Sequence, residues 1–292
     1  MPTDQPTGTR LPVRKTHKLF IGGAFPRSES GRSYPVHGAE GDLLAHAAHA
    51  SRKDVRDAVK AARGAQAGWA RATAYNRGQV VYRIAEMLEG RRAGLADEVR
   101  AAEGGSPAAA AAQVDAAIDR LVWYAGWADK YAQVVGSTNP VAGPYFSFTL
   151  PEPTGVVGVV APADSSLLGL VSVVAPVVVT GNACVVVASE TRPLPAVSFA
   201  EVLAISDVPA GVVNVLTGPV AELAAPLAAH RDVNALDLTG VPEADRRDLA
   251  RAAADSVTRV HAPDHEDWDA TPGLARLGAF IEDKTVWHPL GV

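Results

Sequence analysis

Cys184 is the only cysteine in the chain and therefore the only side chain that could form a reactive thiolate. It follows Gly181-Asn182-Ala183 and lies in an apolar, β-branched run, which predicts a buried strand. Buried thiols of this kind usually serve packing, whereas reactive cysteines lie in exposed, electropositive surroundings. We therefore expect Cys184 to be chemically inert, and a lone cysteine excludes an intramolecular disulfide.

The densest group of polar side chains extends from His261 to Asp269. This run, HAPDHEDWD, contains two imidazoles and four carboxylates, so a metal site is one interpretation. However, the spacing matches no established ligand motif, and acidic runs of this kind are more often solvated. We expect a solvated linker here and predict no metal site.

The elements that would position these residues follow from the hydrophobic pattern. The segment from Gly155 to Val160 is a β-branched run typical of a parallel strand that is buried on both faces. Further strands are predicted over 183–187 and 212–216, with helices between them over 166–180 and 195–205. This alternation of strands and helices predicts a doubly wound parallel sheet.

The region before this sheet is predicted to be mainly helical. A short strand at 19–23 and an extended stretch up to about His49 come first, and Ser51 with Asp54 then resembles a capping box. The alternating run 146–150 predicts a strand that Pro151 to Pro153 closes. Apolar residues at helical spacing predict helices that begin at Ser51 and that cover 76–90, 92–103 and 107–131.

Composition narrows the class of protein. The 292 residues are 48% hydrophobic, which is enough for one large domain or two modest ones. The net charge of -5 and the scattered Lys and Arg argue against a nucleic-acid partner. We interpret residues 1–17 as a flexible arm without a signal peptide, and Pro, Gly and polar residues interrupt the apolar segment 156–187. We therefore expect a soluble, cytoplasmic protein without a membrane span.

Several stretches, taken in order, resemble the NAD(P)-dependent aldehyde dehydrogenase family. The resemblance runs from Lys18 to about Val260 and returns at LGAFIEDKTVW, which begins at Leu277. In this order and at family-like spacings, a chance match is improbable. The stretches are LFIGGAF at Leu19, RIAEMLEGRR at Arg83, YAGWADKY at Tyr124, EPTGVVGVVAP at Glu152, APVVVTGNACVVV at Ala175, GVVNVLTG at Gly211 and LTG at Leu238.

The resemblance implies a Rossmann-like α/β fold, in which a doubly wound parallel sheet accompanies an N-terminal helical region and a small β oligomerisation element. The implied cofactor-domain framework covers residues 18–260 and includes an oligomerisation strand at about 145–153. A C-terminal oligomerisation tail would cover 277–292. Residues 261–276 would then be a linker that replaces the family's catalytic domain, as after an internal deletion.

The residues with which the family oxidises aldehydes have no counterparts here. Its nucleophilic cysteine belongs to the missing catalytic domain, and its E-L-G-G general-base motif is absent, since the chain continues as HAPD from His261. Its oxyanion asparagine lies in A-P-W-N-F-P, and the matching APADSS places Asp164 at that position. An ionised carboxylate offers acceptors where an oxyanion needs donors. The resemblance therefore implies a pseudoenzyme that is inactive on its own.

The family's cofactor site is altered in parallel. Its K-P-S-E stretch supplies a ribose-binding lysine, but this chain reads VASE from Val187 and lacks the ammonium group. Its G-S-T-E-V-G turn becomes GVPEAD from Gly240, which removes a hydroxyl and an N–H and adds a carboxylate. We expect no cofactor, or weak NAD(P) binding at most. The cofactor positions that remain are Pro162, Ser189, Glu190, Gly218 and Gly240.

In the family, the oligomerisation strands extend the catalytic-domain sheet of a neighbouring subunit. The matching strands here would expose apolar faces and open edges, which favours a partner that supplies the missing sheet. We therefore predict a silent subunit of a hetero-oligomer that stabilises or tunes a full-length aldehyde dehydrogenase. The alternatives are a stand-alone nucleotide-binding or sensing module and a divergent aldehyde oxidoreductase. The predicted interface residues are Phe146, Phe148, Leu150, Phe280, Ile281, Val286 and Trp287.

Overall fold

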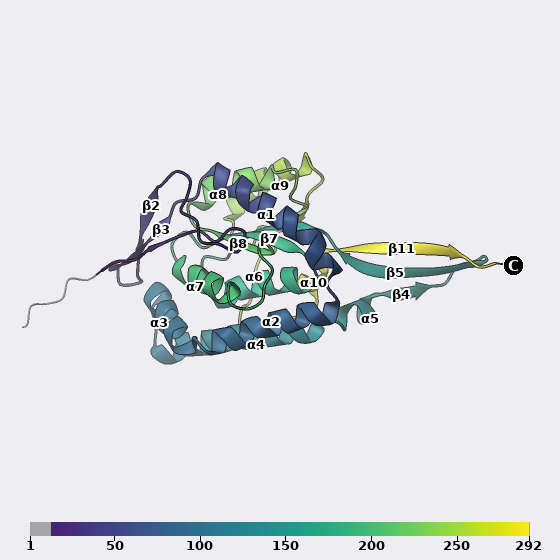
Figure 1. Ribbon diagram of the computed structural model, residues 1–292, viewed down its shortest axis with the longest axis horizontal. Helices are drawn as coiled ribbons and strands as arrows, with labels where there is room; N and C mark the ends of the chain where they lie inside the picture. Colours follow the sequence, from purple (N-terminus) through teal and green to yellow (C-terminus); the bar gives the residue numbers. More distant parts are fainter. Residues whose placement is uncertain (1–12, 292) are drawn as a thin grey trace, which may run out of the picture.

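The computed structural model describes residues 13–291 and confirms the predicted α/β fold (Figure 1). Its centre is a five-stranded parallel sheet in the order β10-β9-β6-β7-β8. The strands of this sheet are β6 (Val156–Val160), β7 (Ala183–Val187), β8 (Val213–Leu216), β9 (Ala235–Asp237) and β10 (Arg259–His261). The helices are α1 (Arg52–Arg71), α2 (Ala74–Glu89), α3 (Arg92–Glu103), α4 (Pro107–Trp127), α5 (Tyr131–Val135), α6 (Leu168–Val179), α7 (Leu194–Leu203), α8 (Val220–Ala228), α9 (Glu243–Ala254) and α10 (Ala275–Gly278).

Helices cover both faces of this sheet. Figure 1 shows α1, α8 and α9 on one side and α2, α4, α6 and α7 on the other. Along β6, Val157 and Val159 pack into one hydrophobic cluster, and Val156 and Val160 pack into the other. Alternate side chains of a strand point to opposite faces, so an unbroken apolar run suits a strand that is buried on both sides.

The N-terminal region forms a small sheet with the order β1-β3-β2. Residues 1–12 of the predicted flexible arm lie outside the described residues, but Thr16–His17 form strand β1 and pair with β3, so the arm prediction is wrong for these two residues. The capping box is present, because Ser51 accepts from the Asp54 N–H and the Asp54 side chain accepts from the Ser51 N–H. The other strands of this sheet are β2 (Ser33–His37) and β3 (Leu43–Ala48).

Two predicted elements differ in extent. The expected strand at 19–23 is reduced to isolated bridges, between Phe20 and Val215 and between Ile21 and Ala24. The single helix expected over 107–131 is divided, because residues 128–130 form a turn between α4 and α5. This turn brings the buried Tyr131 to the base of the next sheet.

A third sheet extends away from the rest of the molecule (Figure 1). We call it the protruding sheet, and its strands are β4 (Ser137–Asn139), β5 (Tyr145–Pro153) and β11 (Ile281–Pro289), in the order β11-β5-β4. β11 pairs antiparallel with β5 along its whole length, from Ile281 opposite Pro153 to Pro289 opposite Tyr145. β5 was expected to close at Pro151 but continues through it. β4 pairs only with residues 147–149, so the prolines lie beside an open edge, where no neighbouring strand needs their missing N–H.

A buried asparagine joins the protruding sheet to the central sheet. The Asn182 side-chain oxygen accepts from the Gly155 N–H at 2.7 Å, and its amide nitrogen donates to the Phe280 carbonyl at 2.9 Å. The Thr154 N–H also donates to the Phe280 carbonyl. The residues just after β5 and just before β11 are therefore fixed to one point below the central sheet.

No helix within residues 13–291 is both long enough and apolar enough to cross a membrane.

Candidate functional site

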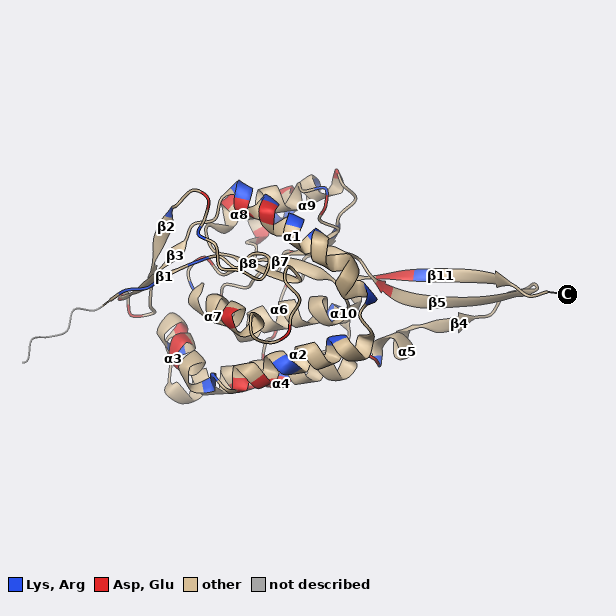
Figure 2. Ribbon diagram, viewed as in Figure 1, with Lys and Arg blue, Asp and Glu red and all other residues tan. Residues whose placement is uncertain are grey.

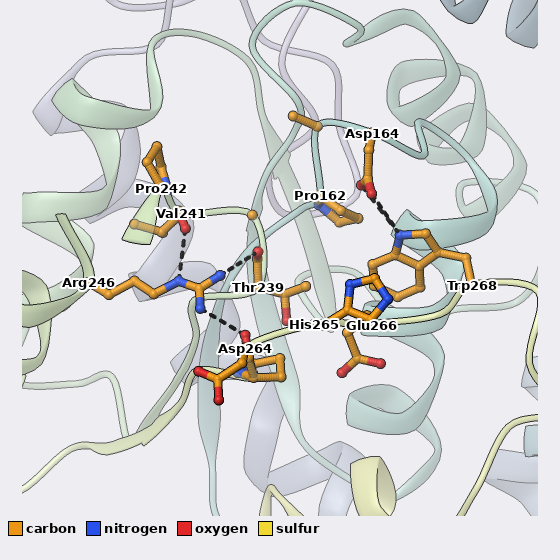
Figure 3. Close-up of a pocket in the computed structure, with 13 residues that line it drawn as sticks. Pro162, Asp164, Thr239, Val241, Pro242, Arg246, Asp264, His265, Glu266 and Trp268 are labelled. Carbon is orange, nitrogen blue, oxygen red and sulfur yellow. Dashed lines mark hydrogen bonds between the residues drawn. The ribbon is translucent and has the colours of Figure 1, made fainter. Parts of the chain in front are cut away.

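The loops after β6 and β9 enclose a cavity of about 340 Å³ at the carboxyl edge of the central sheet. Such edges are where α/β sheets commonly bind ligands. Of the predicted cofactor positions, the cavity lining includes Pro162 and Gly240, and it also includes Asp164. The segment after β10 forms the remaining wall, through Asp264, His265, Glu266 and Trp268 (Figure 3).

Gly240 holds the two loops in direct contact. Its N–H donates to the Val160 carbonyl at 2.9 Å, and a Cβ atom at this position would lie 2.0 Å from the Ala161 carbonyl oxygen. A larger residue would therefore separate the loops. The turn remains close to β6 even though Val241 and Pro242 have replaced residues of the family motif.

Arg246 crosses the cavity between the turn and the opposite wall (Figure 3). Its guanidinium donates to the Val241 carbonyl at 2.9 Å and to the Pro263 carbonyl at 2.8 Å, with a longer contact of 3.4 Å to Thr239. Its hydrogen bonds are thus made to the backbone of its own chain. An anion in the cavity would have to share these donors or displace a carbonyl.

Asp164, which occupies the family's oxyanion-asparagine position, faces Trp268. The indole Nε1–H lies 3.3 and 3.4 Å from the two carboxylate oxygens (Figure 3). An ionised carboxylate is an acceptor only, so this side chain provides no donor to a developing oxyanion.

The connecting segment, residues 262–274, is fixed to the protein by two buried arginines. Arg120 donates to Ser172 Oγ at 2.7 Å and to the Trp268 and Ala270 carbonyls at 2.7 and 2.8 Å. Burial lowers the pKa of Arg120, and the three acceptors satisfy three of its five N–H donors. These contacts fix the backbone at Trp268 and Ala270, but the carboxylates of Asp264, Asp267 and Asp269 are exposed, as expected of a solvated run.

Arg276 provides the second attachment, from α10. It donates to Asp237 at 2.8 Å, to Glu266 at 2.7 Å and to Thr239 Oγ1 at 3.0 Å, and its guanidinium lies 5.7 Å from the Trp268 ring centroid. Burial opposes its charge, but Asp237 and Glu266 outweigh burial and raise the pKa of Arg276. The two arginines thus tie the connecting segment to Asp237 at the end of β9 and to Ser172 within α6.

The remaining cofactor positions do not line this cavity. Ser189 accepts from the Arg192 N–H, and Glu190 accepts from the Val220 N–H at the start of α8. Arg192 donates in turn to the Ala163 and Asp164 carbonyls. Gly218 has a φ of 145°, a conformation that favours glycine, and lies against His49 and Ala50.

Cys184 is the second residue of β7 and is completely buried. Burial raises the pKa of its thiol to about 12, so the thiolate is not populated near neutral pH. Among residues 13–291, no group of three or more His, Cys, Asp or Glu side chains is placed to hold a metal ion.

The predicted interface residues fall into two groups. On the protruding sheet, Phe146, Leu150 and Trp287 are 46%, 47% and 58% exposed, and Phe148 and Val286 are partly buried. Phe280 and Ile281 are instead buried in the main hydrophobic cluster, so their prediction as contact residues is wrong. Phe280 and Ile281 come just before the exposed part of β11, and they anchor this strand in the hydrophobic core.

Sequence reasoning did not identify Arg120, Arg246 or Arg276 as site residues. Arg120 bonds residues 52 to 150 positions away, whereas Arg246 bonds residues 5 to 17 positions away, and an arginine in the sequence carries no local sign of either kind of contact. The aligned family motifs gave no indication of them, because these residues lie outside the motif positions.

Comparison with known proteins places this arrangement in context. Residues 26–263 match the model of the "Aldehyde dehydrogenase family". The chain is 34% identical over 261 residues to mitochondrial aldehyde dehydrogenase of Sus scrofa and 35% identical over 252 residues to retinal dehydrogenase 2 of Mus musculus. These alignments cover 87% and 84% of this chain but 49% and 48% of the relatives, so the chain spans about half their length.

Solved structures agree with the sequence comparisons. HpcC from Thermus thermophilus superposes with a TM-score of 0.81 at 32% identity, over 85% of this chain and 48% of that one. A putative aldehyde dehydrogenase from Burkholderia cenocepacia superposes with a TM-score of 0.80 at 32% identity, over 84% of this chain and 51% of that one. From its sequence and from its fold, the chain belongs to the aldehyde dehydrogenase family.

Proposed function

We propose that this protein is a non-catalytic subunit that assembles with a full-length NAD(P)-dependent aldehyde dehydrogenase and stabilises or tunes it. The observation that carries the proposal is the protruding sheet. No Lys, Arg, Asp or Glu occurs in residues 137–151 or 285–291, and this part of the sheet carries no charge in Figure 2. An exposed apolar element of this kind marks an interaction site.

Both faces of this sheet carry exposed apolar side chains. Phe146, Phe148 and Leu150 alternate along β5 and therefore share a face, and Val286 of β11 lies opposite Phe148. On the other face, Asn139 donates to Ser147 and Thr149, and Thr149 bonds Thr285. This second face also carries the exposed Tyr145 and Trp287, because Trp287 lies opposite Ser147 and its ring contacts that of Tyr145.

The outer edge of β11 offers a second means of attachment. β11 has nine residues, is paired on one side only and is the terminal strand of its sheet. An open edge of this length can accept an added strand from a partner, with main-chain hydrogen bonds contributing to affinity. The catalytic-domain sheet of a full-length family member is the partner that we propose.

The candidate site supports the silent character of the subunit. The thiol of Cys184 is buried and protonated, and Asp164 presents acceptors where the family uses a donor. The match to the family model ends at residue 263, within the connecting segment that Arg120 and Arg276 fix. We propose that this segment replaces the catalytic domain.

Co-expression with individual full-length aldehyde dehydrogenases of the native cells tests the proposal. Size-exclusion chromatography with light scattering would measure stoichiometry, and NAD-dependent aldehyde oxidation would measure the effect on the partner. A fixed complex is expected, and Phe146→Asp should abolish it. Tyr82→Asp is the matched control, because Tyr82 has the same 46% exposure on α2, away from the protruding sheet.

The outcomes are distinct. A complex that resists Phe146→Asp would show that the protruding sheet is not the contact, and a monodisperse chain that binds none of these enzymes would refute the proposed function. Activity of the isolated chain on aldehydes would refute its silent character.

A second candidate function is nucleotide binding by the chain alone. It is favoured by the cavity at the carboxyl edge, where Gly240 keeps the family's close approach between loops. Calorimetric titration of the purified chain with NAD and NADP would measure it. Saturable binding that Arg246→Gln alters would support this function, whereas heats equal to those of dilution would exclude it.

A further inference from the structure

A second pocket of about 260 Å³ lies beside the small N-terminal sheet, away from the candidate site. It shares no lining residue with the cavity at the carboxyl edge of the central sheet. Among the described residues, its lining contains three cations and no carboxylate. The lining residues are Thr16, His17, Lys18, Arg27, Ser28, Gly31, Arg32, Ser33 and Ala48.

The cations of this pocket are largely free to bind a ligand. Lys18 and Arg27 are exposed and make no side-chain hydrogen bond or ion pair with any residue of 13–291. Arg32 lies 4.0 Å from Glu222, whose carboxylate is bonded at 3.0 Å to His49. Two full positive charges and part of a third therefore face the pocket.

The nearest buried carboxylate, Asp54, is already satisfied. It accepts from Ser28 Oγ at 2.8 Å, from the Glu29 N–H at 3.2 Å and from the Ser51 N–H at 2.8 Å. These donors stabilise its charge inside the protein, and its carboxylate does not line the pocket. The hydroxyls of Thr16 and Ser33 remain as possible donors in the wall.

His17 contributes a buried nitrogen without a partner. Its Nδ1 is shielded from solvent and makes no hydrogen bond. Burial lowers the pKa of His17, and Lys15 lowers it further, against an opposing effect of Glu201. The imidazole is thus neutral at neutral pH, and the tautomer with a proton on Nδ1 can donate to a ligand.

We propose that this pocket binds a tetrahedral oxyanion, namely the phosphate group of a small phosphorylated compound. Lys18, Arg27 and Arg32, which all line the pocket, supply charge-assisted hydrogen bonds, and His17 gains the partner that it lacks. A phosphate carries several strong acceptor oxygens, which matches this excess of donors. The site is separate from the proposed docking surface and does not depend on it.

Calorimetry with sulfate, inorganic phosphate and glucose 6-phosphate, at constant ionic strength with chloride as the balancing ion, tests the proposal. One saturable site is expected, and Arg27→Gln should weaken binding about tenfold, as for loss of one charged hydrogen-bond partner. Lys60→Gln is the control, because it removes the same charge from an exposed position on α1 outside the pocket. Tighter binding of glucose 6-phosphate than of phosphate would identify a phosphorylated compound as the ligand, and the reverse would identify the free anion.

Sulfate provides an independent readout, because its charge does not change between pH 7 and 5.5. Protonation of His17 strengthens an anion complex, so sulfate affinity should rise as the pH falls. His17→Gln should flatten this rise, apart from any part of it that comes from the neighbouring charged groups, which are Lys15, Lys18, Arg27, Arg32 and Glu201. No binding of any probe, or equal weakening by Arg27→Gln and Lys60→Gln, would overturn the proposal.

Discussion

The central sheet is parallel and the protruding sheet is antiparallel, and the two sheets also differ in what their side chains do. Every residue of β6 and β7 is buried, whereas in β11 only Ile281 is buried and most of the strand is exposed. Removing apolar surface from water contributes about 25 cal/mol per Å², so the central sheet provides stability. The protruding sheet has yet to bury its exposed apolar side chains, and these side chains can contribute to association.

The base of β11 offers the strongest test of this division. Phe280 is fully buried, so Phe280→Ala should lower the free energy of unfolding by about 3–5 kcal/mol. Chemical denaturation followed by tryptophan fluorescence would measure the change. A loss below about 1 kcal/mol, together with a loss of association, would instead place Phe280 at the interface.

The connecting segment provides a second test, in which the expected loss of stability is similar to that of Phe280→Ala or slightly smaller. Arg276→Met would leave the completely buried Asp237 without its cation, which should cost about 3 kcal/mol. Equilibrium unfolding would measure this loss, and the double variant with Asp237→Asn should recover part of it. Equal losses in the single and double variants would contradict an ion-pair origin.

Val257 is an exception to the good packing of the central part of the molecule. It follows α9 with a φ of 55° and is 92% exposed, a conformation that is unfavourable for a β-branched residue. Val257→Gly should therefore raise the free energy of unfolding by up to about 1 kcal/mol. A thermal melt would detect this as a higher Tm, and Ser256→Gly is the control at the neighbouring position.

A smaller effect is expected from His261, which lies at the end of β10. Burial lowers its pKa, Arg276 lowers it further, and Asp237 and Glu266 oppose them. The folded state favours the neutral imidazole, so its stabilisation is complete above the unfolded pKa of about 6.5 and is lost as the pH falls through the lowered folded pKa. Urea unfolding at pH 7.5 and 5.5 should show a smaller decrease for His261→Gln than for the unaltered protein.

The smallest change in stability is expected on the protruding sheet. Phe146→Asp should alter the free energy of unfolding by no more than about 0.5 kcal/mol, because the side chain is exposed and packs mainly against Phe148. Denaturation of the isolated chain would measure it. A large loss of stability would show that the two sheets do not divide their roles in this way.

The sequence carried strong signals for the central elements. The β-branched run 183–187 and the helix over 92–103 match β7 and α3, because both patterns are long enough to show their period. The serine that begins α1 was also predictable from a local capping interaction. β9 and β10, with three residues each, are too short to show any period and were not predicted as strands.

The candidate site was harder to predict than the fold. Of the five predicted cofactor positions, only Pro162 and Gly240 line the cavity, together with Asp164, because these residues follow the adjacent strands β6 and β9. The contacts of Trp268 with Asp164 and of Arg120 with the connecting segment join residues more than a hundred positions apart. The composition of the connecting segment suggested a solvated run. It could not show that two arginines elsewhere in the chain fix this segment.

The bonds of Asn182 have a mechanical consequence. One amide holds the backbone both just after β5 and just before β11, so the protruding sheet has a fulcrum below the central sheet. A load applied at the tip, near Tyr145 and Pro289, is transmitted along two antiparallel strands to this base, where Arg259 also bonds Ile281 and Glu282. The angle at which the protruding sheet leaves the molecule is therefore set inside the protein, by a buried amide far from the tip of the sheet.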